Sequence, residues 1–301
     1  MDNHLIPGQE DKDLPFYFKP KQVTDVKRLN NWHAISNGID ENMLQGKNKR
    51  MGYISFAAVF LVVIGAIWFF TIRETPPELT TYATGYGKVK IMLLPDSSKL
   101  ILNANSTVKI PKDWKTTGNR EVWLEGEAYF EVTKKIATGQ KFIVHTNQVD
   151  VEVLGTRFNV NTRRSESIVA LAEGKVQLAI KEKGVTVIKD LNMPSLVLKP
   201  GQVAKVDSTL HVSVAEDTNI DRYASWVQHE YHFDNTSLGT VAGIIEDTYG
   251  YKMIVQDSTL LQRSISGDLR AENIDAFVNV LQATFSLKMT IDKKTIIISQ
   301  P

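Results

Sequence analysis

The stretch VDVEVLGTRFNVN, residues 149–161, alternates apolar and polar side chains on both sides of a glycine. Val149, Val151 and Val153 alternate with acidic residues, and the apolar positions return at Phe158 beyond the glycine. A period of two residues is typical of a strand with one buried face, and a glycine between two such runs marks a turn or a bulge. This stretch therefore predicts two short strands rather than a helix.

The same pattern extends over residues 83–220, where no window of useful length has the helical period. Turn-forming residues divide this region into short runs, at Pro95, Pro111, Gly118, Gly155, Gly174, Gly184 and Pro200. Many short strands without helices between them predict a mainly β domain, which is either an antiparallel sandwich or a solenoid-like stack.

One run of this region, residues 124–132, contains two carboxylates, Glu125 and Glu127, that would project from the same face of a strand. A carboxylate pair can perform acid–base chemistry. No partnered base, metal ligand or nucleophile accompanies the pair, and carboxylates on a solvated strand face are common. We therefore predict no catalytic residue and do not expect an enzyme.

The C-terminal residues, 221–301, contain an internal repeat, in which VAGIIEDTYGYKMIV at 241–255 matches FVNVLQATFSLKMTI at 277–291. Each unit reads as a helix followed directly by a strand, with apolar helix faces at Leu238, Val241, Ile245 and Tyr249 and at Ile274, Phe277, Leu281 and Phe285. Further strands are expected at 229–233, 264–269 and 295–299, and helix caps at Asn235 or Ser237 and at Glu272 or Asn273. The pattern predicts an α+β domain of two βαβ-like units, with two helices on a small sheet.

Few residues suggest metal or cofactor chemistry. His229 and His232 form an HxxH pair, but in the strand predicted there they point to opposite faces, and no third ligand accompanies them. The chain has no cysteine, which excludes disulfides, thiol catalysis and cysteine-based zinc sites. Its 35 basic and 34 acidic side chains nearly balance, so no global field attracts nucleic acid. We expect neither a cofactor nor a metal, and no direct contact with nucleic acid.

Residues 51–72 contain no charged side chain. A helix of this length rises roughly 33 Å, which is enough to cross a bilayer core of about 30 Å. A buried core helix of similar length usually carries a polar face, and a cleaved signal peptide would be shorter, closer to the N-terminus and followed by small residues. We therefore predict one transmembrane helix, followed by a linker, residues 73–82, that two prolines stiffen.

Flanking charges predict the orientation of this helix. Basic residues cluster before it in KNKR, residues 47–50, whereas Arg73 after it is followed at once by Glu74. The positive-inside rule then places residues 1–50 in the cytoplasm and residues 73–301 outside it.

The cytoplasmic segment has one amphipathic pattern, in which apolar residues recur every three positions at Val23, Val26, Leu29, Trp32 and Ile35. This spacing predicts a helix of about four turns. A lone helix of that length cannot bury its apolar face by itself. Either it lies on the membrane or is mostly disordered, or its apolar face enters a groove of a partner protein.

Several motifs occur together in the order and spacing of one protein family. They are LPDSS at 94–98 with LNANS at 102–106, Arg120 with LEGEAYFEV at 124–132, FIV at 142–144, VLGTRFNV at 153–160, EGKV at 173–176 and LKPGQ at 198–202. On these motifs the chain resembles the FecR family, the transmembrane anti-sigma factors and sigma regulators of Gram-negative bacteria. Further matches, at Trp226, FDN 233–235 and Tyr249-Gly250, resemble the family's C-terminal domain, which is similar to the secretin/TonB short N-terminal domain.

The chain also departs from the family at two points. Ser97 stands where relatives usually have glycine, so the turn that contains it is expected to differ in type. The cytoplasmic segment, residues 1–50, is shorter than is common among relatives.

The resemblance implies a relay across the bacterial envelope, with the chain as a single-pass inner-membrane protein whose C-terminus is periplasmic. A TonB-dependent outer-membrane receptor would bind a nutrient, and its signalling domain would contact residues 221–301. The cytoplasmic segment would then free or activate an extracytoplasmic-function sigma factor through the apolar face of residues 23–35. We expect the receptor contact at an exposed edge of the strand 295–299, at Ile296 and Ile298, by β-augmentation.

A different function also fits the sequence. The chain would then be a membrane-tethered periplasmic module that binds a glycan or a peptide directly, without transcriptional output. Sugar binding by residues 74–301 would favour this function, whereas genes for a sigma factor and a TonB-dependent receptor beside this one would favour the relay.

Overall fold

The computed structural model describes residues 60–65, 78–112, 114, 118–182, 185–186 and 196–299. The chain divides into two compact units, Met1–Thr75 and Pro76–Pro301. Of the first unit only residues 60–65 are described, and they are helical. Within the described residues, no helix is both long and apolar enough to cross a membrane. The second unit contains two separate hydrophobic cores, one in each of two domains.

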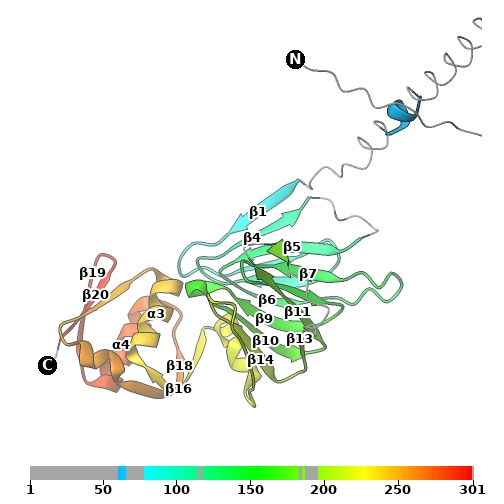
Figure 1. The fold of residues 1–301 in the computed structure, drawn as a ribbon. Helices are drawn as coiled ribbons and strands as arrows, with labels where there is room; N and C mark the ends of the chain where they lie inside the picture. Colours follow the sequence, from blue (N-terminus) through cyan, green and yellow to red (C-terminus); the bar gives the residue numbers. More distant parts are fainter. Residues whose placement is uncertain are drawn as a thin grey trace, which may run out of the picture. The chain divides into compact units, whose positions relative to one another are not determined.

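The first domain, residues 79–216, is a β-sandwich of two sheets (Figure 1). Along the first sheet the strands follow the order β1 (Leu79–Ala83), β4 (Thr107–Pro111), β5 (Arg120–Glu125), β7 (Phe142–His145), β8 (Val149–Val153), β11 (Val176–Glu182) and β12 (Val185–Thr186), and β13 (Leu196–Leu198) also pairs with β11. Along the second sheet they follow the order β15 (Val212–Glu216), β14 (Gln202–Val206), β10 (Ser167–Glu173), β9 (Arg157–Asn161), β6 (Glu127–Glu131), β3 (Lys99–Leu102) and β2 (Lys90–Leu93). Neighbouring strands described in this domain are antiparallel, except that β5 and β7 are parallel.

The core lies between the two sheets and confirms the alternation that the sequence predicts. Phe130 on β6 stacks on Phe158 on β9, with ring centroids 5.0 Å apart. Phe142 on β7 of the other sheet meets Phe130 edge to face at 6.0 Å. All three side chains are fully buried, so the two sheets share one core. Of the two architectures left open by the sequence, this is the sandwich.

The run 124–132, predicted to be one strand, forms two. It divides at Gly126, which has a φ of 99°, where the chain passes from β5 in the first sheet to β6 in the second. A Cβ atom at this position would lie 2.4 Å from Oγ and 2.8 Å from Cα of Ser106. Glu125 is exposed at the end of β5, whereas Glu127 is buried on β6, so the two carboxylates share no strand face.

The beginning of the sandwich shows two further differences from expectation. It starts at Leu79, inside the segment 73–82 that was expected to be a linker, because β1 pairs with β4 along its whole length. In the turn before β3, Ser97 has a φ of 68°, the left-handed conformation that glycine adopts most easily. Serine therefore keeps the turn in the backbone conformation that a glycine would favour.

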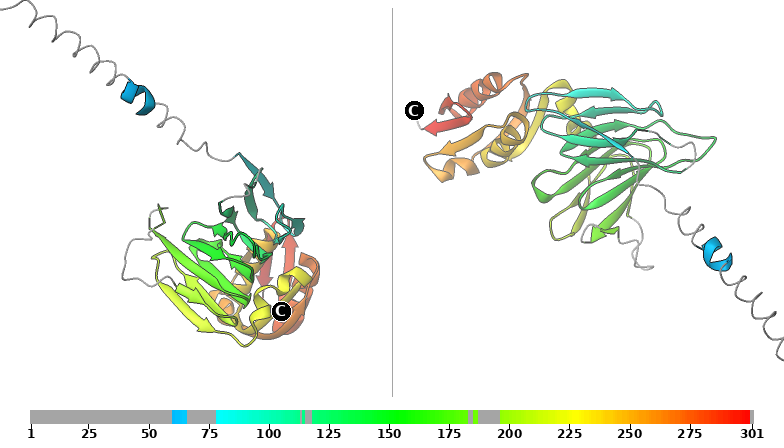
Figure 2. Two further views of the ribbon diagram at one scale, coloured as in Figure 1. Left: turned by 90° about the vertical axis from the view of Figure 1, so that its right-hand side faces the viewer. Right: turned by 90° about the horizontal axis from the view of Figure 1, so that it is seen from above.

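The second domain follows two short 3-10 helices, η2 (Ile220–Tyr223) and η3 (Ser225–Gln228). Its elements are β16 (Glu230–Ser237), α3 (Leu238–Tyr249), β17 (Lys252–Val255), η4 (Ser258–Gln262), β18 (Ser264–Arg270), α4 (Ile274–Phe285), β19 (Lys288–Asp292) and β20 (Thr295–Ser299) (Figures 1 and 2). All the apolar positions assigned to the two helix faces are buried. The two helices predicted from the repeat are therefore confirmed.

The two helices begin and end alike, which supports the internal repeat. Ser237 and Asn273 are the N-caps, and each side chain accepts a hydrogen bond from a backbone N–H of the first turn. Gly250 and Ser286 end the helices with φ of 73° and 51°, the left-handed conformation that turns the chain into the next strand. The strands differ from expectation, because they form two small sheets, β16–β18 and β17–β20–β19, rather than one.

Candidate interaction surfaces

The strand 295–299 was expected to expose an edge, but it is the central strand of its sheet. β20 pairs in parallel with β17 on one side and antiparallel with β19 on the other. Ile296 and Ile298 are fully buried in the core of the C-terminal domain. The placement of these two side chains at an exposed edge is therefore wrong, because pairing occupies both edges and the core covers both side chains.

The opposite face of this sheet is open. Ile254 on β17 and Ile297 on β20 are partners in the register and are 55% and 40% exposed. Thr290 on β19 is the partner of Ile297 on the other side, and the exposed Lys252 and Lys288 lie on the same face. Within the described residues, β17 and β19 each leave one edge unpaired. An aliphatic pair among hydroxyl and ammonium groups, beside two free strand edges, suits a partner that adds a strand or covers the face.

A second group of side chains lies on the outer face of the first sheet of the sandwich. Nδ1 of His145 is 2.7 Å from Oδ1 of Asp150, and Nε2 is 3.2 Å from Oε2 of Glu121. Trp123 stacks on the imidazole with ring centroids 4.9 Å apart, and Nζ of Lys181 is 2.6 Å from the same Oδ1 of Asp150. No local sequence pattern indicates this cluster, because its members come from four strands.

The cluster predicts a pH-dependent stability. Burial and the charge of Lys181 disfavour the charged imidazole. The hydrogen bond and charge of Asp150, and then the hydrogen bond of Glu121, outweigh them and raise the pKa of His145 above its ordinary value of 6.5. A raised pKa stabilises the fold fully below the unfolded-state value, and that contribution is lost as the pH rises through the folded-state value. We therefore expect residues 76–301 to have a larger free energy of unfolding at pH about 6 than at pH about 8.5, measured by urea denaturation.

Two substitutions check this expectation. His145→Gln should reduce the difference between the two pH values, because glutamine cannot become a cation between the carboxylates of Asp150 and Glu121. His211→Gln, which changes an exposed histidine, should leave the difference in place. The same pH dependence in both variants would contradict a role for His145.

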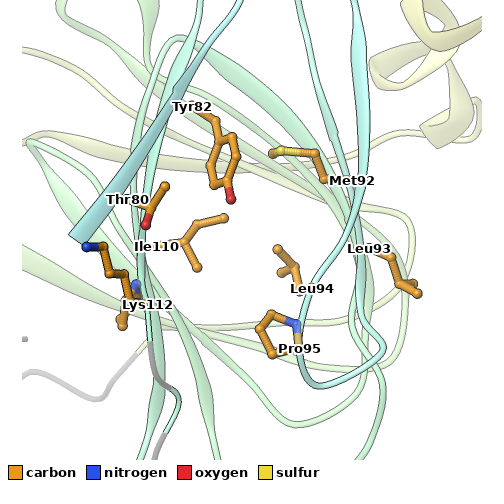
Figure 3. Close-up of a pocket in the computed structure, with 9 residues that line it drawn as sticks. Thr80, Tyr82, Met92, Leu93, Leu94, Pro95, Ile110 and Lys112 are labelled. Atoms are coloured by element: carbon orange, nitrogen blue, oxygen red, sulfur yellow. The ribbon is translucent and has the colours of Figure 1, made fainter. Parts of the chain in front are cut away.

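A cleft of about 320 Å³ opens between β1 and β4 on one side and β2 on the other (Figure 3). Its lining residues are Thr80, Tyr82, Met92, Leu93, Leu94, Pro95, Ile110, Pro111 and Lys112. Tyr82, Met92 and Ile110 converge on the cleft, and Lys112 forms an ion pair with Glu78. The lining mixes aliphatic side chains with the polar groups of Thr80, Tyr82 and Lys112. It has no carboxylate and no imidazole, so its chemistry suits binding rather than acid–base catalysis.

The remaining candidates from the sequence do not come together as a chemical site. Glu127 is satisfied within the fold, because its two oxygens accept hydrogen bonds from two buried asparagines. His229 ends η3 with a φ of 58°, whereas His232 lies on β16 and pairs with Asp268. Among the described residues, no group of three or more His, Asp or Glu side chains is arranged to hold a metal ion.

The expected contacts with a sigma factor lie outside the described residues. These are Val23, Val26, Leu29, Trp32 and Ile35. The same is true of the predicted transmembrane helix, residues 51–72, apart from residues 60–65.

Comparisons with known proteins match both domains. The FecR protein family matches residues 80–177, and the FecR C-terminal family matches residues 230–298. Two crystal structures of a candidate anti-sigma factor from Parabacteroides distasonis each superpose with a TM-score of 0.60, at 25% and 24% sequence identity. Each match covers 74% of this chain and 100% or 99% of the relative's chain. No curated protein sequence gives a significant match.

Proposed function

The chain belongs to the FecR family of anti-sigma factors, and we propose that it relays a signal across the inner membrane to an extracytoplasmic-function sigma factor. The signal would come from a TonB-dependent outer-membrane receptor. The observation that carries this proposal is the match of both domains, in chain order, to the two parts of one regulatory family. The solved structure at 25% identity supports it, because that protein is also described as a candidate anti-sigma factor.

The sequence supports the membrane topology of the relay. Residues 51–72 are uncharged and long enough to span a bilayer, and the basic cluster at 47–50 favours a cytoplasmic N-terminus. Residues 1–50 would then meet the sigma factor, and the two domains of residues 79–299 would lie in the periplasm.

Because Ile296 and Ile298 are buried, this proposal assigns the receptor contact to other residues. The open face with Ile254 and Ile297, together with the free edges of β17 and β19, is better suited to it. A strand of the receptor's signalling domain could pair with either edge and place apolar side chains against Ile254.

A binding measurement tests the output of the relay. Residues 1–50 should retain the sigma factor encoded nearest to this gene in a pull-down, and Trp32→Ala should weaken binding at least tenfold, because large aromatic side chains dominate helix-in-groove contacts. Asn31→Ala, at the neighbouring polar position, is the matched control and should bind normally. If the folded sigma factor does not bind residues 1–50, the cytoplasmic segment is not the output element.

The cleft lined by Tyr82 and Met92 favours one alternative function, a membrane-tethered module that binds a peptide or glycan without transcriptional output. Tyr82 and Met92 offer the kind of apolar lining that a short ligand could occupy (Figure 3). Binding of a free sugar or peptide by residues 76–301, together with no sigma-factor binding by residues 1–50, would favour the alternative.

A further inference from the structure

One turn of the sandwich contacts the C-terminal domain. The 3-10 helix η1 (Arg163–Ser165) joins β9 to β10, and Arg164 within it has a φ of 56° and a ψ of 36°. Residues other than glycine adopt this left-handed conformation rarely, and they keep it only when surrounding contacts offset its cost. Within the sandwich, Gln148 holds the turn through a hydrogen bond to the carbonyl oxygen of Ser165. The side chain of Arg164 itself contacts α3 of the other domain.

Arg164 binds α3 with one edge of its guanidinium group. Nε and Nη2 donate to the two carboxylate oxygens of Asp247 at 2.8 and 3.1 Å. Nη2 also donates to Oε2 of Glu246 at 3.2 Å and to the carbonyl oxygen of Gly243 at 2.9 Å. Gly243 leaves room for this approach, because a Cβ atom there would lie 3.1 Å from Cζ of Arg164. Two parallel hydrogen bonds to one carboxylate are the strong geometry for an arginine ion pair.

The loop between β1 and β2 contacts the end of the same helix. The backbone N–H of Gly87 donates to the carbonyl oxygen of Thr248 at 2.7 Å. The ring of Tyr86 covers Gly250, where a Cβ atom would come within 2.9 Å of a ring carbon. This loop follows β1, the first described strand after the proposed membrane segment. The end of α3 is therefore held by two separate loops of the sandwich.

The connector between the domains is also fixed to the sandwich. Trp226 in η3 is buried, and its Nε1 donates to Oδ1 of Asn159 on β9 at 3.3 Å. The amide of Asn159 in turn donates to Glu127 at 2.9 Å. Because the connector is anchored at Trp226, any motion of the C-terminal domain would pivot about this point.

The joint, formed by the contacts of Arg164, Tyr86 and Gly87 with α3, differs in chemistry from the two domain cores. The two hydrophobic clusters have no residue in common. The side chains of Arg164, Glu246 and Asp247 are 51%, 42% and 23% exposed. Polar, solvent-accessible contacts between domains permit relative motion, and salt screens their charges. The joint therefore has the properties of a contact that can open while both domains stay folded.

We propose that Arg164 is a releasable latch that holds the C-terminal domain in its docked position on the sandwich. A partner that engages the acidic end of α3 would displace Arg164 from Glu246 and Asp247 and free the domain to pivot at Trp226. Opening would also release the loop of Tyr86 and Gly87, which follows β1. This inference deepens the proposed relay and rests on it for its biological role.

The test measures the distance between the two domains in the full chain, reconstituted in lipid nanodiscs. The chain has no native cysteine, so Ser208→Cys on the sandwich and Lys288→Cys on β19 accept one nitroxide label each. Both positions are exposed and lie outside the contacts of the joint. Double electron–electron resonance gives the distribution of distances between the two labels, which should be narrow in the parent chain. It should be about twofold broader, or more, in Arg164→Glu, because this variant places three acidic side chains next to one another.

Three further samples make the test decisive. Arg164→Ala should broaden the distribution less than Arg164→Glu, and combining Arg164→Glu with Asp247→Arg should narrow it again. Arg157→Ala is the matched control, since Arg157 pairs with Glu173 within the sandwich, and it should match the parent. A narrow distribution in Arg164→Glu, or equal broadening in Arg157→Ala, would overturn the latch. The measurement needs no partner protein, so its failure is distinguishable from failure of the sigma-factor pull-down.

Discussion

Arg120→Ala is expected to lower the free energy of unfolding of the sandwich by about 3–5 kcal/mol, because it leaves a buried carboxylate without its cation. The side chains of Arg120 and Asp96 are only 2% and 4% exposed, and Nη1 lies 2.6 Å from Oδ2 of Asp96. The same guanidinium donates to three backbone carbonyl oxygens, those of Thr133, Gln140 and Leu154. Removing it takes the cation from Asp96, which keeps only the hydrogen bonds from the backbone N–H and hydroxyl of Ser98, and takes one donor from each of three carbonyl groups.

Urea denaturation of residues 76–301, followed by tryptophan fluorescence, measures this loss. Arg120→Lys should have an intermediate effect, because lysine keeps the charge but not the fork that reaches several acceptors at once. Arg157→Ala is the control, since the exposed pair of Arg157 and Glu173 is expected to contribute at most about 1 kcal/mol. A loss in Arg120→Ala no larger than in Arg157→Ala would show that the buried pair does not stabilise the fold.

The C-terminal domain shows how far local periodicity can predict a fold. The spacing of apolar residues identified both helices, and the capping residues Ser237 and Asn273 were among those expected. The order of the strands was not predictable in the same way, because it depends on pairing between segments that are distant in sequence. Strand 295–299 reads TIIIS, a run of apolar residues typical of a strand buried on both faces, yet only the face of Ile296 and Ile298 is buried.

The candidate surfaces were less predictable than the fold. Arg164 meets Asp247 across 83 residues of chain, and nothing near either residue in the sequence indicates the contact. The His145 cluster likewise depends on the order of strands in a sheet. Arg120 is the informative case, because its place in a family motif marked it as notable, but only the structure shows that it is buried against Asp96.

The prediction of a single strand at residues 124–132 was wrong for a different physical reason. Apolar residues at Leu124, Ala128 and Phe130 keep the period of two across Gly126, so the pattern reads as one strand. The period reports which side chains face the core, and both sheets of a sandwich face the same core. A chain that crosses from one sheet to the other can therefore keep its alternation. Only the backbone conformation of Gly126 reveals the crossing.

Gly126→Ala is expected to lower the free energy of unfolding by about 3–4 kcal/mol, again measured by urea denaturation of residues 76–301. Two costs contribute, the positive φ of 99° and the overlap of the new Cβ atom with Ser106, including its backbone Cα at 2.8 Å. Gly118→Ala separates them, because Gly118 has a φ of 107° but no atom within 4 Å of the added Cβ. Gly118→Ala should lower the free energy of unfolding only by the cost of the positive φ, about 1–2 kcal/mol. Equal losses in the two variants would mean that Ser106 gives way and that the close approach does not constrain the crossing.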